Sequence, residues 1–251
     1  KLDTLFSIVR QQDDFVPYDY VIIDEAQDVL DKGAIQILNS LSSVTQAGLS
    51  SGRYLVFYDT EQGYDYQSRH ISDIADSIAI NGARFVLDTN KRVPTNKEIV
   101  SFANSLLDGV SFDELFARII EDNYDSVKVF CFDGAKTLIK HITAIKKDIR
   151  ENAKRWNDYV ILADSSSKKE QVSETERLYD RIATIDGIKE LSVKNVCSET
   201  DELPFTSILS YKGLESKHVV LVINGRTPID TFELYIGMTR AIIDLQILIL
   251  K

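Results

Sequence analysis

The sequence has few of the residues that most often bind metal ions or form covalent cross-links. Only two cysteines occur among the 251 residues, Cys131 and Cys197, and they do not have the spacing of a metal site. The three histidines, His70, His141 and His218, are widely scattered, which argues against a zinc site or a histidine-based catalytic site. Because so few cysteines are typical of a reducing compartment, we expect a cytoplasmic protein.

Long apolar runs are also absent. No run approaches the roughly 20 residues that a helix needs to cross a bilayer, so we expect no membrane partner. No signal peptide is present, and the chain begins at a lysine rather than a methionine, so we expect it to be a piece of a longer polypeptide. The hydrophobic fraction of 44% permits a sizeable core, and the charged fraction of 27% is ordinary for a soluble protein.

Positive charge is in short supply and is unevenly distributed. The formal net charge is −10, which argues against unspecific coating of DNA by a basic protein. Residues 1–82 contain 5 Lys and Arg against 13 Asp and Glu, whereas residues 83–251 contain 24 against 26. This change in charge balance predicts a domain boundary between residues 82 and 83. Because neither part has an excess of positive charge, any nucleic acid would have to bind a local basic part of the surface.

Residues 20–24 are a short, apolar, β-branched run that predicts a buried parallel strand. The run ends in two adjacent carboxylates, Asp24 and Glu25. Ligands of open α/β sheets lie beyond the carboxyl ends of the strands, and Mg²⁺ prefers carboxylate and phosphate oxygens. The pair therefore predicts a metal-assisted site in which the second acid orients or deprotonates a water. The alternative is an ordinary acidic turn between a strand and a helix.

The rest of the chain alternates between strand and helix patterns, which predicts an α/β fold with mainly parallel strands. Helical spacing of apolar residues predicts helices over 1–18, 33–43, 94–108, 134–155, 169–182 and 231–241. Apolar runs predict further strands over 53–59, 84–88, 127–132, 159–163, 207–210, 218–223 and 245–250.

Five stretches of the chain combine into a recognisable order. They are residues 21–28 (VIIDEAQD), 59–62 (DTEQ), 87–92 (LDTNKR), 207–215 (SILSYKGLE) and 235–241 (YIGMTRA). In this order they resemble motifs II to VI of the UvrD/Rep-type superfamily 1 DNA helicases. The resemblance implies two RecA-like P-loop NTPase lobes, the first partial over 1–82 and the second largely complete over 83–251.

The resemblance also implies ATP and Mg²⁺ as cofactors and assigns roles in the first lobe. By this resemblance Asp24 would bind Mg²⁺, and Glu25 would activate the water that attacks ATP. Gln62 would sense the γ-phosphate and couple it to movement on single-stranded or partly duplex DNA. Tyr64 and Tyr66 follow Gln62 and could stack on bases, although packing within the protein explains them equally well.

In the second lobe the resemblance makes Arg92 and Arg240 arginine fingers. The guanidinium is always charged and its fork matches phosphate oxygens, which suits it to negative charge that develops during phosphoryl transfer. Gly213 and Glu215 would approach the sugar and phosphates of the nucleotide. Taken singly, Arg92 and Arg240 could instead be ordinary surface residues. Gly213 could likewise belong to an ordinary tight turn.

The sequence departs from the family in several places. The phosphate-binding loop, Gly-x-x-x-x-Gly-Lys-Ser/Thr, does not occur in this sequence, so we expect it on a preceding segment of the parent chain and expect the 251 residues alone to be inactive. Lys91 stands where motif IV of the family usually has a tyrosine that stacks on adenine. Leu209 stands where motif V often has a histidine, and Tyr58 replaces the glycine of motif III. The interval between motifs IV and V is too short for the large accessory domain of strand-separating members.

Two functions remain open from the sequence. The first is a DNA helicase or translocase that couples ATP hydrolysis between its lobes to movement. The second is a catalytically inactive ATPase-fold module with a regulatory or interaction role, which the acidic charge and the departures favour. A third possibility is a receiver-like domain in which Asp24 and Asp59 form an acid pocket, but such a domain does not explain the second lobe.

Overall fold

The computed structural model describes residues 20–26, 53–58, 82–86, 97–111, 114–115, 117–118, 124–164, 178–192, 195, 198–228 and 230–251. The chain separates into two compact units, Lys1–Thr89 and Asn90–Lys251. The step in charge predicts a boundary slightly earlier, after residue 82. The helices predicted over 1–18 and 33–43 lie outside the described residues.

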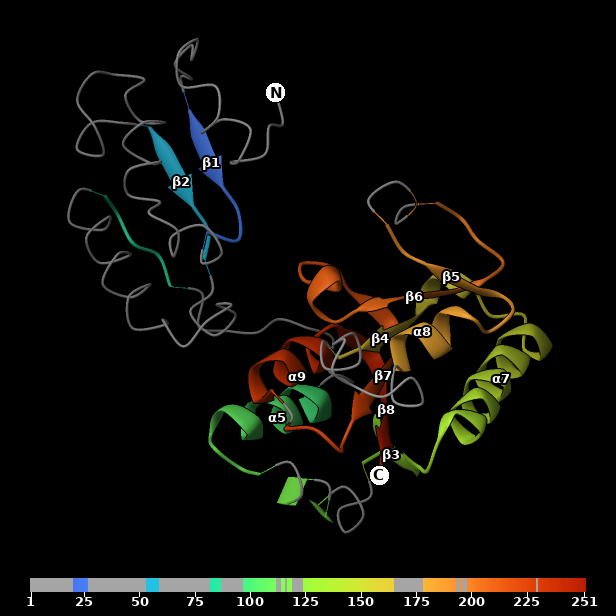
Figure 1. Ribbon diagram of the computed structural model, residues 1–251. Coiled ribbons are helices and arrows are strands. Elements are labelled where there is room, and N and C mark those ends of the chain that lie inside the picture. Colours follow the sequence, from blue (N-terminus) through green and yellow to red (C-terminus); the bar gives the residue numbers. More distant parts are fainter. Residues whose placement is uncertain are drawn as a thin grey trace. The chain divides into compact units, whose positions relative to one another are not determined.

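The first unit contains two short parallel strands, β1 (Val21–Ile23) and β2 (Tyr54–Val56) (Figure 1). The sequence predicts that β1 is buried, which the structure corrects in part. Ile23 is 4% exposed, but the cross-strand partners Ile22 and Leu55 are 69% and 50% exposed, because alternate side chains along a strand point to opposite faces of the sheet. Residues 84–86, predicted as part of a strand, form none.

The second unit is built on a six-stranded parallel sheet, which confirms the predicted α/β class and is consistent with a RecA-like lobe. The strand order is β3-β8-β7-β4-β6-β5. The strands are β3 (Val127–Phe132), β4 (Tyr159–Ala163), β5 (Ile188–Glu190), β6 (Leu203–Ser207), β7 (Ser216–Asn224) and β8 (Ala241–Leu250).

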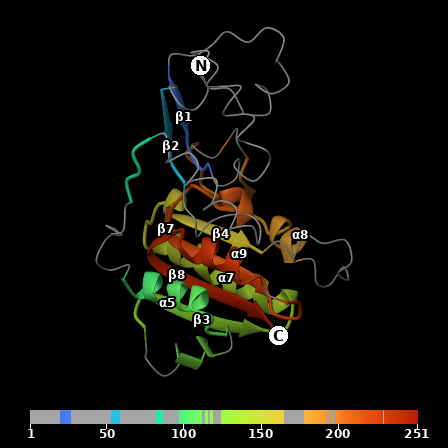
Figure 2. The same ribbon diagram turned by 90° about the vertical axis from the view of Figure 1, so that its left-hand side faces the viewer.

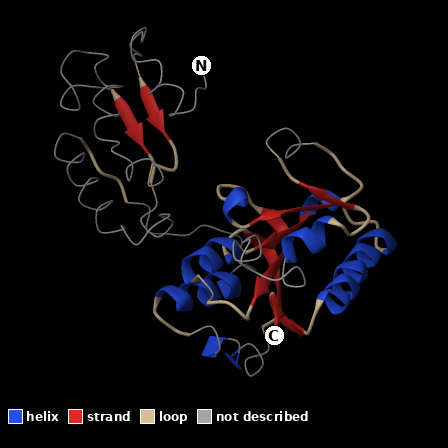
Figure 3. Cartoon of the chain, in the orientation of Figure 1, coloured by secondary structure: helices blue, strands red, loops and turns tan. Residues whose placement is uncertain are grey.

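Helices cover both faces of this sheet (Figures 2 and 3). On one face, α5 (Lys97–Leu107) and α9 (Thr231–Met238) bury apolar side chains such as Ile99 and Leu234 against the strands. On the other face, α7 (Ala135–Glu151) and α8 (Leu178–Ala183) bury side chains such as Leu138 and Ile182. Alternate residues of each central strand supply the two cores, so β4 is buried throughout.

The ends of several elements differ from the sequence prediction for local reasons. Helix α7 ends at Glu151, not near 155, because Ala153 adopts a left-handed conformation (φ 49°) and the Lys154 N–H bonds back to the Ile149 carbonyl at 3.0 Å. The strand predicted over 207–210 lies earlier in the chain, as β6 (Leu203–Ser207). It ends at Ser207, whose hydroxyl accepts a hydrogen bond from the Ser210 N–H. Residues 209–211 then form a 3₁₀ turn.

Strand β5 was not predicted, and β8 begins at Ala241 rather than 245. The difference in β8 matters because it brings Asp244 into the sheet opposite His218. Among the described helices, none combines the length and the apolar character needed to cross a bilayer.

Three tyrosines of the second unit are almost fully buried, Tyr159, Tyr179 and Tyr211. Burial is the main cause that raises the pKa of each phenol, because the charged phenolate is poorly solvated in the interior. For Tyr179 the hydrogen bond that its hydroxyl donates to the Glu190 carboxylate raises the pKa further.

We therefore expect the second unit to lose stability in alkali. Below about pH 10 the phenols are protonated in both states and stability is unaffected. Above it the unfolded chain releases protons that the folded chain keeps, so the free energy of unfolding falls by up to about 1.4 kcal/mol per pH unit for each tyrosine. Urea unfolding from pH 8 to 11 measures the slope, and Tyr179→Phe with Tyr211→Phe should flatten it. Parallel curves for the wild type and this double variant would contradict the prediction.

Candidate functional site

Asp24 and Glu25, predicted as a magnesium ligand and a catalytic base, lie where β1 ends. Asp24 is exposed, and its Oδ1 accepts a hydrogen bond of 3.0 Å from the Glu25 N–H. The turn is tied to the neighbouring strand, because the Ala26 N–H donates to the Phe57 carbonyl at 2.9 Å and the Phe57 N–H donates to the Ile23 carbonyl at 2.8 Å. The carboxyl ends of β1 and β2 are therefore held side by side.

Glu25 adopts a left-handed backbone conformation, with φ of 52°. This conformation costs roughly 1–2 kcal/mol for a residue with a Cβ, and such outliers cluster at functional sites. An exposed carboxylate at a strand end, with one oxygen held by a backbone N–H, fits the donor set of Mg²⁺, which is bound by one or two carboxylates together with substrate phosphates. Asp24 could therefore hold a magnesium ion.

In the second unit, the predicted residues Gly213, Glu215 and Arg240 gather where β7 and β8 begin. Ser216 pairs with Ala241 across these strands, and the Ser216 N–H donates to the Arg240 carbonyl at 3.0 Å. Gly213 has a φ of 82°, which favours glycine and lets the chain turn sharply into β7. The sheet register thus brings together two motifs that are separated in sequence.

The guanidinium of Arg240 is held within its own unit. The side chain is only 4% exposed, and its Nε donates to the Ile236 carbonyl at 3.1 Å. The two terminal nitrogens donate to the Leu214 carbonyl at 3.4 Å and to the Thr239 hydroxyl at 3.0 Å. The longest of these bonds links Arg240 to the turn that carries Gly213 and Glu215.

Two further side chains position this corner. The Tyr211 hydroxyl donates to the Glu215 carbonyl at 3.1 Å, which ties down the turn. Asp230 caps α9 by accepting hydrogen bonds from the Phe232 and Glu233 N–H groups at 2.9 and 3.1 Å, and so fixes the start of the helix that leads to Arg240.

The predicted site residues that are described form two groups, one in each unit. Asp24 and Glu25 belong to the first, and Gly213, Glu215 and Arg240 to the second. Gln62, Arg92, Tyr64 and Tyr66 lie outside the described residues, so their roles stay predictions.

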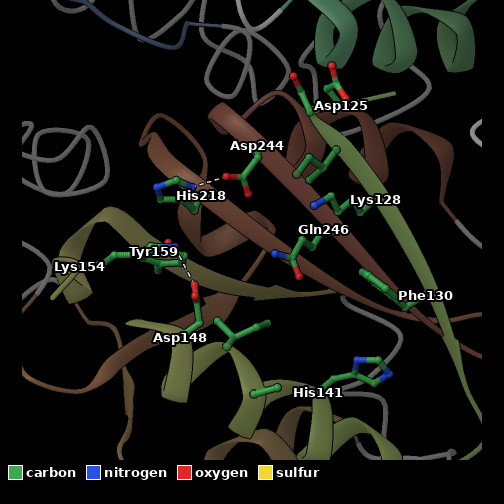
Figure 4. Close-up of a pocket in the computed structure, with 14 residues that line it drawn as sticks. Asp125, Lys128, Phe130, His141, Asp148, Lys154, Tyr159, His218, Asp244 and Gln246 are labelled. Carbon is green, nitrogen blue, oxygen red and sulfur yellow. Dashed lines mark hydrogen bonds and ion pairs between the residues drawn. The ribbon is translucent and has the colours of Figure 1, made fainter. Parts of the chain in front are cut away.

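Sequence reasoning missed a pocket on the α7 face of the second unit, lined by the starts of β3, β4, β7 and β8 (Figure 4). It includes a hydrogen-bonded pair of His218 and Asp244. A signal was present, since Asp244 and Gln246 have the spacing of one strand face, and His218 and Lys128 interrupt otherwise apolar strands. The sequence alone does not show the register of β3, β7 and β8 that brings these four residues together.

Comparisons with known proteins add little. No known protein family matches the sequence, and no curated protein matches it. Among solved structures, the chain is similar to one described as the C-terminal domain of a possible DNA helicase from Lactobacillus plantarum, with 12% identity, a TM-score of 0.42, and coverage of 64% of this chain and 88% of that chain. A likeness this distant carries no functional argument.

Proposed function

We propose that this chain belongs to an ATP-dependent DNA helicase or translocase of the UvrD/Rep type, which acts in the cytoplasm on single-stranded or partly duplex DNA. A preceding segment of the same parent polypeptide would supply the phosphate-binding loop. The observation that carries the proposal is the strained turn at Glu25, held at the end of β1 by Asp24 and by Phe57. An ordinary acidic turn needs no left-handed glutamate.

In this function Glu25 accepts a proton from the water that attacks the γ-phosphate, and Asp24 binds the magnesium ion. A bound Mg²⁺ would neutralise phosphate charge, which is the main requirement of phosphoryl transfer. The adjacent end of β2 leads toward Gln62, which would respond to the γ-phosphate.

The second unit would supply the arginine finger. Arg240 can serve only if its guanidinium leaves the Leu214 carbonyl, and that bond of 3.4 Å is longer than its bonds to Ile236 and Thr239. Nucleotide binding would then pull on the turn of Gly213 and Glu215, since both are attached to this contact. Arg92 would act as the second finger. Movement of the Arg240 guanidinium between the Leu214 carbonyl and the phosphates of ATP would couple ATP hydrolysis to movement on DNA.

A second function has one observation in its favour. The guanidinium of Arg240 is buried and bonded to Ile236, Leu214 and Thr239, as expected of a structural arginine in an inactive module. In that case the protein would serve as a regulatory or interaction domain.

The two functions are separated by an assay of ATP turnover in the longer polypeptide that joins a phosphate-binding loop to this chain. We expect turnover that single-stranded DNA stimulates, and a loss of about 10²–10⁴-fold in Glu25→Gln, the range of a general base. The matched control is Glu114→Gln, which alters an exposed glutamate paired with Arg118 and should leave turnover unchanged.

Absence of turnover in the folded wild-type polypeptide would favour the inactive module. Full turnover in Glu25→Gln would show that another group serves as the base.

A further inference from the structure

The pocket on the α7 face has a volume of about 450 Å³, within the range of small-ligand sites. It lies between α7 and the amino-terminal halves of β3, β8, β7 and β4 (Figure 4). None of the helicase-like residues line it. It could therefore serve a function separate from ATP hydrolysis.

The pocket exists because polar residues interrupt an otherwise apolar sheet face. Farther along the same face, β7 and β8 present Val220, Val222, Leu248 and Leu250 to the core beneath α7 and α8. At the pocket these strands present His218, Asp244 and Gln246, and β3 presents Lys128. The register places Lys128 beside Gln246 and His218 beside Asp244, so the four form one continuous patch.

One wall of the pocket is fixed by its own contacts. His218 is paired with Asp244 through Nδ1, and its ring stacks on Tyr159 with 4.2 Å between centroids and 19° between planes. Lys154 donates to Asp148 at 2.7 Å. These groups satisfy one another, so they form a rigid frame rather than the binding groups.

Two polar side chains of the pocket are not used by the fold. Within the described parts of the chain, the amide of Gln246 makes no hydrogen bond and the ammonium of Lys128 makes no ion pair. Both lie against the open space between Asp148 and Asp244 (Figure 4). They are available to a ligand.

Beside them lies an aromatic surface. Phe130 is 37% exposed, and its ring is in contact with His141 at 5.4 Å between centroids. Phe130 is two residues from Lys128 on the same side of β3, which puts it diagonally across from Gln246.

The charges of the pocket nearly cancel. Its lining carries Lys128 and Lys154 against Asp125, Asp148 and Asp244, with two histidines. A strong anion or cation would therefore gain little from the pocket as a whole. A neutral, planar ligand with a donor next to an acceptor fits better.

We propose that this pocket binds a single unpaired nucleobase. The Gln246 amide offers one donor and one acceptor to the edge of the base, the arrangement by which glutamine recognises adenine. Phe130 stacks on its face, as aromatic side chains do on single-stranded nucleic acid. Lys128 is placed to reach the attached sugar or phosphate. The base could come from a free nucleoside or from single-stranded DNA, and the site does not depend on ATP hydrolysis.

Isothermal titration calorimetry on the 251-residue chain tests this proposal. Adenosine, guanosine, cytidine and thymidine are titrated separately, without Mg²⁺, and a short single-stranded oligonucleotide forms a second arm. We expect binding of one nucleoside, or of the oligonucleotide, at a one-to-one ratio. Gln246→Leu and Phe130→Leu should each weaken it about tenfold or more, since stacking and edge recognition are each lost.

The matched controls are Ile139→Ala, an exposed apolar residue on α7, and Lys136→Ala, an exposed lysine of the same helix. Neither lines the pocket, and both should bind like the wild type. Thermal melts verify folding, and if Phe130→Leu does not fold, the half-buried Gln246→Leu decides.

Binding of a nucleoside that both pocket variants weaken would identify a free ligand. Binding of the oligonucleotide alone, weakened in the same way, would identify DNA. No binding in either arm, or binding that neither variant affects, would overturn the proposal. None of these outcomes depends on ATP turnover, so failure of the helicase function remains distinguishable.

Discussion

Replacement of Arg240 by alanine is expected to lower DNA-stimulated ATP turnover by about 10³–10⁵-fold in the polypeptide that contains a phosphate-binding loop. An arginine finger offsets negative charge that develops on the transferred phosphoryl group, and alanine supplies none of it. Arg240→Lys should restore little, because an ammonium keeps the charge but loses the planar fork that also bonds to Ile236, Leu214 and Thr239. Steady-state turnover at saturating ATP and DNA measures the effect.

The control is Arg226→Ala. Arg226 is an exposed arginine of the same unit that donates to the Lys251 carbonyl at 2.9 Å, and its replacement should leave turnover unchanged. Because Arg240 is buried, thermal melts must show that its variants fold. A folded Arg240→Ala protein with normal turnover would make this arginine structural and would favour the inactive module.

Phe205→Ala is expected to destabilise the second unit by about 3–5 kcal/mol. Phe205 is fully buried on β6 between β4 and β5, and its ring packs on Tyr179 with 4.4 Å between centroids. Alanine would leave a cavity that the surrounding strands cannot close, because their backbone hydrogen bonds fix their spacing. The loss is a large share of the roughly 5–15 kcal/mol by which domains are stable.

Urea unfolding followed by tryptophan fluorescence measures this loss, since Trp156 is the only tryptophan and packs against the same core. The control is Phe85→Ala in the first unit, where the side chain is 86% exposed and its loss should change stability by less than about 0.5 kcal/mol. Equal midpoints for the Phe205→Ala variant and the wild type would contradict the assigned packing.

Much of the second unit follows from local sequence pattern. Strands β3 and β4 begin and end at the predicted residues, because β4 is an unbroken apolar run, β3 is apolar apart from Lys128, and both are flanked by polar or turn residues. Helix α5 matches its periodic apolar face. Pattern failed at β6, where Pro204 disguises the strand, and at β8, where Asp244 and Gln246 hide its first half. In both, pairing with neighbouring strands overrides local composition.

The candidate sites were predictable to a different degree. Motif order predicted Arg240 and Gly213 as site residues, but it gave no indication that the guanidinium bonds to the turn before β7, since that contact depends on how β7 and β8 align. The strained backbone of Glu25 has no sequence signature, because strain results from the contacts that hold a turn in place. The pocket on the α7 face could not be found from the sequence, because it depends on the register that joins β3, β4, β7 and β8.

The strand order of the sheet has a consequence for how the protein is made. Strand β8 lies between β3 and β7, although it follows both along the chain, so Val127 finds its partner only when Leu245 has been added. Until β8 is translated, β3 has no neighbour in the sheet, and β7 has an open edge once it has been made. Such edges bind other nascent strands, so we expect this stage to depend on chaperones and synthesis without them to yield aggregates.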